Sequence, residues 1–348
     1  MTRRDLSYAH AIREATIQAM DANPRVVVYG LDVPDHKAIY GTTEGLQDRF
    51  GSARVFGTPL SEDAMAGVGI GMALSGLHPM MVHIRMDFLL LAMNQLVNMA
   101  AKLRYMSGGQ LSVPLVIRAI IGRGWGQGAQ HSQGLHSLLA HIPGLMVVAP
   151  TTPADAKGCL LAAFQETCPV IVVEHRLLHT TTGIVEESPV PSRIGQAHRL
   201  VPGRDCTLVG ISHMVPVCLA AARLLESVGV SVSVIDPVWL SSNELDIDTI
   251  AGDVLNTGHL VVVDHAWLSC GMSSEIIVRV LEHPLHATSP PRCRRMGFAF
   301  TPCPTAKSLE DQFYPTPVTV AQQVCSLLDV APAFPETESG EGMFRGPF

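Results

Sequence analysis

Three short segments of the chain carry side chains that could take part in chemistry. The turn 58–63 contains the carboxylate of Glu62, a later segment contains the ring of Phe88, and a glycine-rich loop, 122–133, contains His131. A carboxylate and an imidazole can both move protons to and from a bound ligand. The ring offers an apolar platform, and the glycines allow the backbone around His131 to come close to other groups.

Three further side chains must be weighed beside these. Asp63 follows Glu62 directly, and both acids could simply favour the start of a helix. His136 and His141 are alternatives to His131, and His141, which precedes Ile-Pro-Gly, is expected to be structural. From its type alone Phe88 would more often be a core residue.

Short apolar runs rich in valine and isoleucine alternate with helical patterns along the chain. The runs are continuous, as expected for strands that are buried on both faces of a parallel sheet. This alternation predicts an α/β protein. The predicted strands are 25–30, 80–84, 115–121, 146–149, 170–174, 207–211, 231–235 and 260–264.

Helix starts can be placed beside some of these strands. Ser61 is expected to be an N-cap, with Glu62 in the first turn. Thr152 is a stronger candidate, because Pro153 can occupy the first helical position and Asp155 the third. The pair Gly69 and Gly71 lies inside a helical pattern and is interpreted as helix packing, because the third glycine of a dinucleotide fingerprint is missing.

The chain is predicted to form two α/β domains. Residues 176–204 are interpreted as a crossing segment, and a second unit starts near Thr207. The predicted limits are 1–185 for the first domain, 186–204 for a linker, 205–330 for the second domain and 331–348 for a disordered tail.

Composition excludes several classes of protein. The net charge of −7 argues against a nucleic-acid surface. The mean hydropathy of +0.26 is high, yet the most apolar stretch, 64–97, is interrupted by polar residues, so we expect a large subunit interface and no membrane span. No secretory signal is recognised and the 8 cysteines form no CxxC pair, which together predict a cytoplasmic protein with reduced thiols. Serine-hydrolase, phosphate-loop and HExxH motifs are absent.

Several segments, taken in order, resemble the beta subunit of thiamine-diphosphate-dependent 2-oxoacid dehydrogenases of the pyruvate and branched-chain type. The resemblance covers roughly residues 5–328. It implies a transketolase-like pyrimidine-binding domain followed by a transketolase C-terminal-type domain, each a three-layer unit around a parallel sheet. The matching segments are 58–62, Phe88, 95–109, 130–133, 141–145, 154–158, 309–310 and 315–317.

The resemblance also implies a partner. The family works as an α2β2 heterotetramer in which the alpha subunit holds Mg²⁺ and the cofactor diphosphate through a G-D-G motif. This chain contains no G-D-G string, so no Mg²⁺ ligands are expected in it. The implied activity is decarboxylation of a 2-oxoacid, with transfer of the acyl group to the lipoyl domain of a lipoyl acyltransferase.

The resemblance assigns roles to individual residues. Glu62 would share a proton with N1′ of the aminopyrimidine, and Phe88 and Ile84 would line the cofactor pocket. His131 would shape the substrate end and assist acyl transfer. A potassium ion could bind largely through backbone carbonyls at Leu115, Ala163, Phe164, Glu166 and Cys168.

Some positions depart from the family pattern. Leu31 stands where the family usually has an acid that takes part in a proton relay between active sites, and Gly57 replaces an aspartate. His83, Arg85 and Trp125 are also unusual. These departures keep two alternatives open: a two-chain carboligase or transketolase-like enzyme with a non-lipoyl acceptor, and a non-catalytic partner that retains the fold.

Overall fold

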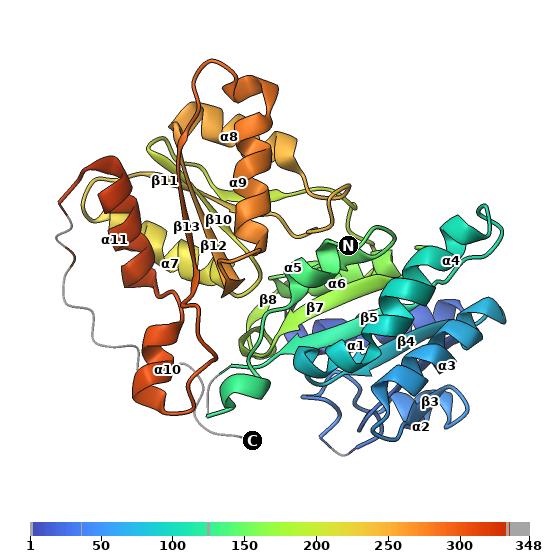
Figure 1. Cartoon of the computed structure of the whole chain (residues 1–348). Coiled ribbons are helices and arrows are strands. Elements are labelled where there is room, and N and C mark those ends of the chain that lie inside the picture. Colours follow the sequence, from blue (N-terminus) through green and yellow to red (C-terminus); the bar gives the residue numbers. More distant parts are fainter. Residues whose placement is uncertain (1–2, 36, 124–125, 332–333, 335–348) are drawn as a thin grey trace. The chain divides into compact units, whose positions relative to one another are not determined.

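The computed structural model describes residues 3–35, 37–123, 126–331 and 334 (Figure 1). The chain divides into two compact units. The first unit comprises Met1–Gly122 and Leu138–Ile194, and the second comprises Arg123–Ser137 and Gly195–Phe348. The loop that carries His131 therefore groups with the second unit. The predicted domain limits remain predictions.

The first unit contains a 6-stranded sheet in the order β3-β2-β4-β5-β7-β6, in which every pairing is parallel. All five strands that were predicted in this part of the chain are present, and the short β3, like β1 and β8, was missed. The bounds are β2 Val26–Gly30, β3 Val55–Gly57, β4 His78–His83, β5 Val116–Ile121, β6 Met146–Val148 and β7 Val170–His175. A separate pair, β1 (Arg3–Ser7) and β8 (Thr182–Glu186), is antiparallel.

Helices surround this sheet. Helix α1 packs against α6, and α3 packs against both η1 and η2. The bounds are α1 Tyr8–Ala22, α2 Leu46–Phe50, α3 Glu62–Leu74, η1 Met86–Ala92, η2 Asn94–Ala100, α4 Ala101–Met106, α5 His136–Ala140, α6 Pro153–Ala163 and η4 Arg176–Leu178.

The second unit contains a 5-stranded sheet in the order β13-β12-β10-β11-β9. Its four main strands are parallel, and β9 pairs with β11 antiparallel. The three strands predicted here are present, whereas β9 and β13 were missed, and β9 lies in the expected linker. The bounds are β9 His198–Val201, β10 Cys206–Gly210, β11 Val232–Asp236, β12 His259–Trp267 and β13 Arg292–Phe298.

Two helix pairs cover opposite faces of the second sheet, α7 with α11 and α8 with α9 (Figure 1). The core on the α7 side consists of aliphatic side chains from both helices and the strands. The bounds are α7 Met214–Glu226, α8 Ile247–Thr257, α9 Met272–Glu282, η5 Pro284–His286, α10 Lys307–Phe313 and α11 Pro317–Leu328. The two-unit α/β prediction is confirmed. Most of the predicted tail, 332–333 and 335–348, lies outside the described residues.

The two predicted helix starts differ in how they are capped. Thr152 caps α6 with a complete capping box, in which its side chain accepts from the Asp155 N–H. Ser61 does occupy the N-cap position of α3, but its side chain makes no capping hydrogen bond. This leaves orphan N–H groups at the start of α3, beside Glu62.

The two glycines of α3, Gly69 and Gly71, differ in the space around them. A Cβ at Gly69 would lie 2.1 Å from the Tyr29 hydroxyl, whereas one at Gly71 would meet nothing within 4 Å. The hydroxyl of the buried Tyr29 donates to the Met65 carbonyl at 3.1 Å. Gly69 is therefore a packing glycine, as predicted, and Gly71 is not.

No helix of the described residues combines the length and the apolar character that crossing a membrane would require.

Candidate active site

Glu62 is the first residue of α3 and is partly buried. Its neighbour Asp63 is exposed and lies 3.5 Å from the Gln95 amide nitrogen. Among the described residues, no side chain forms a hydrogen bond or an ion pair with the Glu62 carboxylate. Glu62 therefore has the spare hydrogen-bonding capacity that a ligand-binding acid needs.

Ile84 and Phe88 follow the carboxyl end of β4. Ile84 is partly buried, and the Phe88 side chain, in η1, is 37% exposed. Phe88 is thus a surface ring of the first unit. Because η1 packs directly on α3, the helix that begins with Glu62 and the element that presents Phe88 form one structural group.

These residues fit the aminopyrimidine end of thiamine diphosphate. Phe88 contributes a partly exposed aromatic ring, and the Glu62 carboxylate has no hydrogen-bonding or ion-pair partner among the described side chains. The Phe88 ring can stack on a heteroaromatic ring, and the Glu62 carboxylate can hold a proton on a ring nitrogen. Among the described residues of the first unit, no cluster of three or more carboxylates suited to Mg²⁺ accompanies them.

His131 lies in the second unit, directly after the 3₁₀ turn η3 (Gly128–Gln130), and is partly buried. Gly126 and Gly128 have φ of +69° and +65°, conformations that L residues rarely adopt. A Cβ at Gly128 would lie 2.6 Å from the Thr305 hydroxyl. The glycines therefore let the His131 loop lie against the segment around Thr305. Trp125 lies outside the described residues.

His136 and His141, the alternatives to His131, differ from it in burial. His136 is 1% exposed, and its Nε2 lies 2.9 Å from Asp264 Oδ1, so its ring is fixed by a buried carboxylate. His141 is exposed. The buried pair made by His136 was not predicted.

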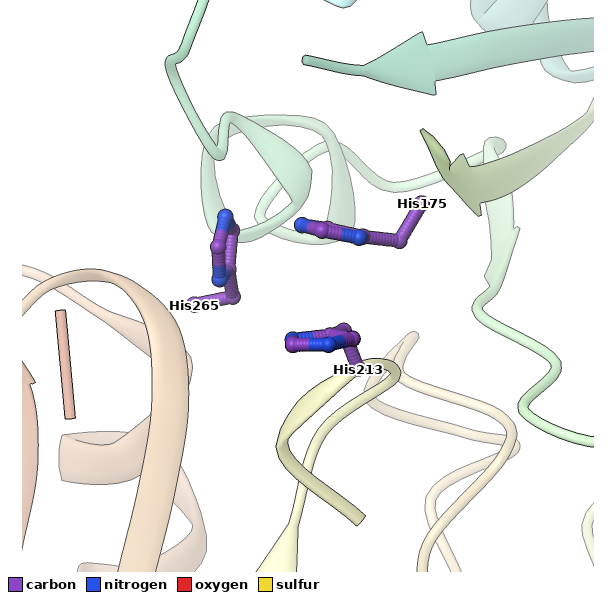
Figure 2. A group of neighbouring side chains, drawn as sticks. All are labelled: His175, His213 and His265. Carbon is purple, nitrogen blue, oxygen red and sulfur yellow. The ribbon is translucent and has the colours of Figure 1, made fainter. Parts of the chain in front are cut away.

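Two more histidines meet at the carboxyl ends of β10 and β12 in the second unit. The rings of His213 and His265 are 6.1 Å apart and nearly perpendicular (Figure 2), and His265 stacks on Tyr314 at 5.1 Å. Burial, with Arg123 adding to it, lowers the pKa of His213 to about 3 and lowers that of His265. Both rings are therefore neutral near pH 7. His175, also drawn in Figure 2, belongs to the first unit, where its Nδ1 accepts from the Leu177 N–H.

A charged network in the core of the first unit was missed by sequence reasoning. The Arg118 guanidinium makes two hydrogen bonds to Glu174, and His179 Nε2 lies 3.0 Å from the same carboxylate. The Arg118 and Glu174 side chains are both 0% exposed. A signal was present, because each apolar run, 115–121 and 170–174, contains one charged residue, and the two charges are opposite.

The predicted potassium ligands are backbone carbonyls of the first unit. The Leu115 carbonyl accepts from the Val170 N–H at 3.0 Å, and the Ala163 carbonyl accepts from the Glu166 N–H at 3.3 Å. A carbonyl oxygen has a second lone pair, so these bonds leave room for a cation. The potassium site stays a prediction.

Comparison with known proteins identifies two domains in the chain. Residues 4–181 match the transketolase pyrimidine binding domain, and residues 195–320 match the transketolase C-terminal domain. The acetoin:2,6-dichlorophenolindophenol oxidoreductase subunit beta of Cupriavidus necator is 37% identical over 91% of this chain and 96% of its own. The pyruvate dehydrogenase E1 component subunit beta of Bos taurus mitochondria is 36% identical over 87% of this chain and 86% of its own.

A solved structure has the same fold. A split-gene transketolase, described as an inactive beta4 tetramer, superposes with a TM-score of 0.74 over 93% of this chain and 99% of its own, at 21% identity. This likeness concerns the fold alone. The two domain matches and the relatives named as beta subunits place this chain in the family of beta subunits of thiamine-diphosphate-dependent 2-oxoacid dehydrogenases.

Proposed function

We propose that this chain is the beta subunit of a heteromeric enzyme that decarboxylates a 2-oxoacid and passes the acyl group to a lipoyl domain. The observation that carries the proposal is the pairing of an unpartnered acid, Glu62, with a surface ring, Phe88, on two elements that pack together. The names of the relatives support the reaction class, because they include subunits of pyruvate dehydrogenases from several organisms.

The residues of this chain have distinct roles in the proposal. Bound thiamine diphosphate would supply an electron sink for decarboxylation. Glu62 holds a proton at N1′ of the aminopyrimidine, while Phe88 and Ile84 fix the plane of that ring and exclude water from one of its faces. His131 donates or accepts a proton at the substrate end. Desolvation of Glu62 by the bound cofactor would favour the shared proton, and the helix start would oppose it.

A second polypeptide completes the site in this proposal. The chain offers no G-D-G string for Mg²⁺ and diphosphate, so an alpha subunit supplies them in an α2β2 assembly. A lipoyl acyltransferase receives the product.

The surface of the first unit supports such a partner. Elements α3, η1, η2 and α4, which pack in succession, expose many large apolar side chains. A monomer rarely leaves so many in one region uncovered. Exposed on this surface are Leu60, Val68, Leu74, Phe88, Leu90, Leu91, Met99, Tyr105 and Met106.

A potassium ion completes the proposal. Carbonyls at the start of β5 and after α6, those of Leu115, Ala163, Phe164, Glu166 and Cys168, would hold it and stiffen the turn between α6 and β7. If so, K⁺ should raise the melting temperature of the chain more than Na⁺ does at equal ionic strength.

The decisive experiment is co-expression with the alpha-like chain, followed by assays with and without a lipoyl domain. We expect decarboxylation together with acylation of the lipoyl domain. Glu62→Gln should lower kcat at least tenfold, because a neutral amide cannot deliver the proton. The matched control is Asp63→Asn, a change of the adjacent exposed acid, which should leave the rate within about twofold.

Other outcomes select the alternatives. A condensation product formed without lipoyl domain or oxidant would replace the dehydrogenase by a carboligase or transketolase-like enzyme. Wild-type rates in Glu62→Gln would support a non-catalytic partner. The departures at His83 and Arg85 are the features that favour a different acceptor.

A further inference from the structure

Three segments of the first unit meet at the carboxyl edge of its sheet. The chain runs from β2 outward to β3 and then returns to place β4 on the other side of β2 (Figure 1). In open α/β sheets the ligand crevice lies at such a reversal of strand order, outside the carboxyl ends of the strands. The segment after β2 carries Tyr40, the segment after β4 carries Arg85, and β7 is followed at once by Arg176.

The turn that carries Tyr40 has an unusual backbone. Ala38, Ile39 and Tyr40 have φ of 47°, 45° and 60°. A left-handed conformation is unfavourable for non-glycine residues, most of all for a β-branched one such as Ile39. Such strain persists only where surrounding contacts enforce it, and it is concentrated at functional sites.

Two threonine hydroxyls supply those contacts. Thr42 Oγ1 donates to the Ile39 carbonyl at 2.8 Å, and Thr43 Oγ1 donates to the Val33 carbonyl at 2.9 Å. The Thr43 N–H adds a bond to the Ala38 carbonyl at 3.0 Å. The strained turn is therefore held in place, and with it the Tyr40 hydroxyl.

Arg85 is oriented by this hydroxyl. Its Nη1 donates to Tyr40 Oη at 2.8 Å and to the Ile84 carbonyl at 2.9 Å. Its Nε is buried and has no hydrogen-bond partner in the structure. Within the described residues, Arg85 forms no ion pair with a carboxylate. A guanidinium with a buried unused donor and no counter-charge is costly, unless a ligand completes it.

A second guanidinium lies beside the same tyrosine. Arg176 Cζ is 5.2 Å from the centroid of the Tyr40 ring, and Arg176 is 6% exposed. Burial lowers the pKa of Arg176, Tyr40 opposes this, and the positive charge of Arg85 lowers it further. The His179 ring, 5.5 Å from Tyr40, is bonded to Glu174.

The carboxylate of Glu174, which is bonded to His179, already has a cationic partner. Both oxygens of Glu174 accept hydrogen bonds from Arg118. Glu174 is therefore committed to Arg118 and is not the counter-charge of Arg85. The two arginines around Tyr40 form a region of concentrated positive charge at the strand-order reversal.

We infer that Arg85, oriented by Tyr40 and assisted by Arg176, binds an oxyanion of a small-molecule ligand, either a carboxylate or a phosphate ester. Guanidinium groups bind both through paired N–H donors. Arg85 stands one residue after Ile84 and three before Phe88, so the bound anion belongs to the substrate or acceptor of the same enzyme. In that assignment the inference rests on the proposed function.

The binding test uses the full-length chain. Inorganic phosphate and pyruvate are titrated separately by calorimetry, against chloride at equal ionic strength. Arg85→Gln should weaken binding of the favoured anion about tenfold or more, since a charged hydrogen bond is lost. Arg85→Lys should recover part of it. The matched control is Arg25→Gln, an exposed arginine at the opposite, amino end of β2, which should bind like the wild type.

Tyr40→Phe provides a second, milder variant should Arg85→Gln fail to fold by circular dichroism. It removes only the hydroxyl that orients Arg85, and we expect weaker binding with an unchanged melting temperature in the absence of anion. Preference for phosphate identifies a phosphate ester, and preference for pyruvate identifies a carboxylate. Unchanged binding in all Arg85 and Tyr40 variants, or equal weakening by Arg25→Gln, overturns the inference.

A kinetic arm separates this inference from the proposed function. In the assembled enzyme, Arg85→Gln should raise KM about tenfold or more with little change in kcat, because it removes a binding contact and not a reacting group. If the anion binds through Arg85 but no alpha-like chain yields turnover, the site stands and the proposed function fails. If the enzyme turns over with KM and anion binding unaffected, the function stands and the site is refuted.

Discussion

Replacing Glu174 by leucine should destabilise the first unit severely. The change leaves the Arg118 guanidinium, 0% exposed, without its carboxylate in the centre of the sheet. Breaking a buried ion pair from one side costs about 3–5 kcal/mol, because an uncompensated charge stays buried. The double variant Arg118→Met with Glu174→Leu removes both charges, and should regain most of that loss.

The same carboxylate predicts how stability depends on pH. Burial by itself would raise the pKa of Glu174, but Arg118 and the hydrogen bond from His179 outweigh it and hold the pKa at about 2, below the ordinary 4.5. The ion pair therefore contributes its full stability above about pH 4.5. That stability is lost as the pH falls toward 2, and the gap corresponds to roughly 3 kcal/mol.

Urea unfolding at pH 7 and at steps down to pH 3 measures both effects. The wild type should lose stability across the acid window, and the double variant should lose less. The reasoning is refuted if Glu174→Leu costs under about 1 kcal/mol, or if the double variant is as unstable as the single one. The double variant also serves as the control for lost packing.

Three further predictions rest on local geometry. Gly69→Ala should destabilise the chain by about 1–3 kcal/mol, because the added Cβ meets the buried Tyr29 hydroxyl. Gly71→Ala places its Cβ in open space and should stabilise the chain by up to about 1 kcal/mol. Urea unfolding measures both changes. Burial lowers the pKa of His83 to about 4, so the folded protein keeps this ring neutral and loses stability as the pH falls from about 6.5 to 4. In His83→Phe, the free energy of unfolding should therefore depend less on pH in that window. Thr152→Ala should cost about 1 kcal/mol through the lost cap of α6, and an unchanged melting temperature would contradict this.

Much of the fold could be predicted because the relevant signals are local. A strand buried on both faces needs a continuous apolar run, and each run that was predicted forms a strand. The strong start at Thr152 is visible because cap, proline and acid lie within four residues. Strands β3 and β9 were missed because one is very short and the other is an edge strand with exposed polar residues.

The candidate site could be predicted only in part from local sequence signals. Glu62 and Phe88 were predicted through their motif, but their types alone left a helix start and a core ring as alternatives. Exposure of the Phe88 ring to 37% removes the second alternative. Arg118 and Glu174 each stand out as a charge inside an apolar run, but they are 56 positions apart, so only the strand order shows that they pair.

The sequence by itself determined the alternation of strands and helices and the family, and it pointed to the acid and the ring that we propose for the cofactor site, since these depend on periodicity and short motifs. Only the tertiary structure decided which charges are compensated. Tyr40, Arg85 and Arg176 come from three separate segments and meet because parallel strands end at one edge of the sheet. The physical reason is that the energy of a buried charge depends on its neighbours in space, and these are set by strand order, not by distance along the chain.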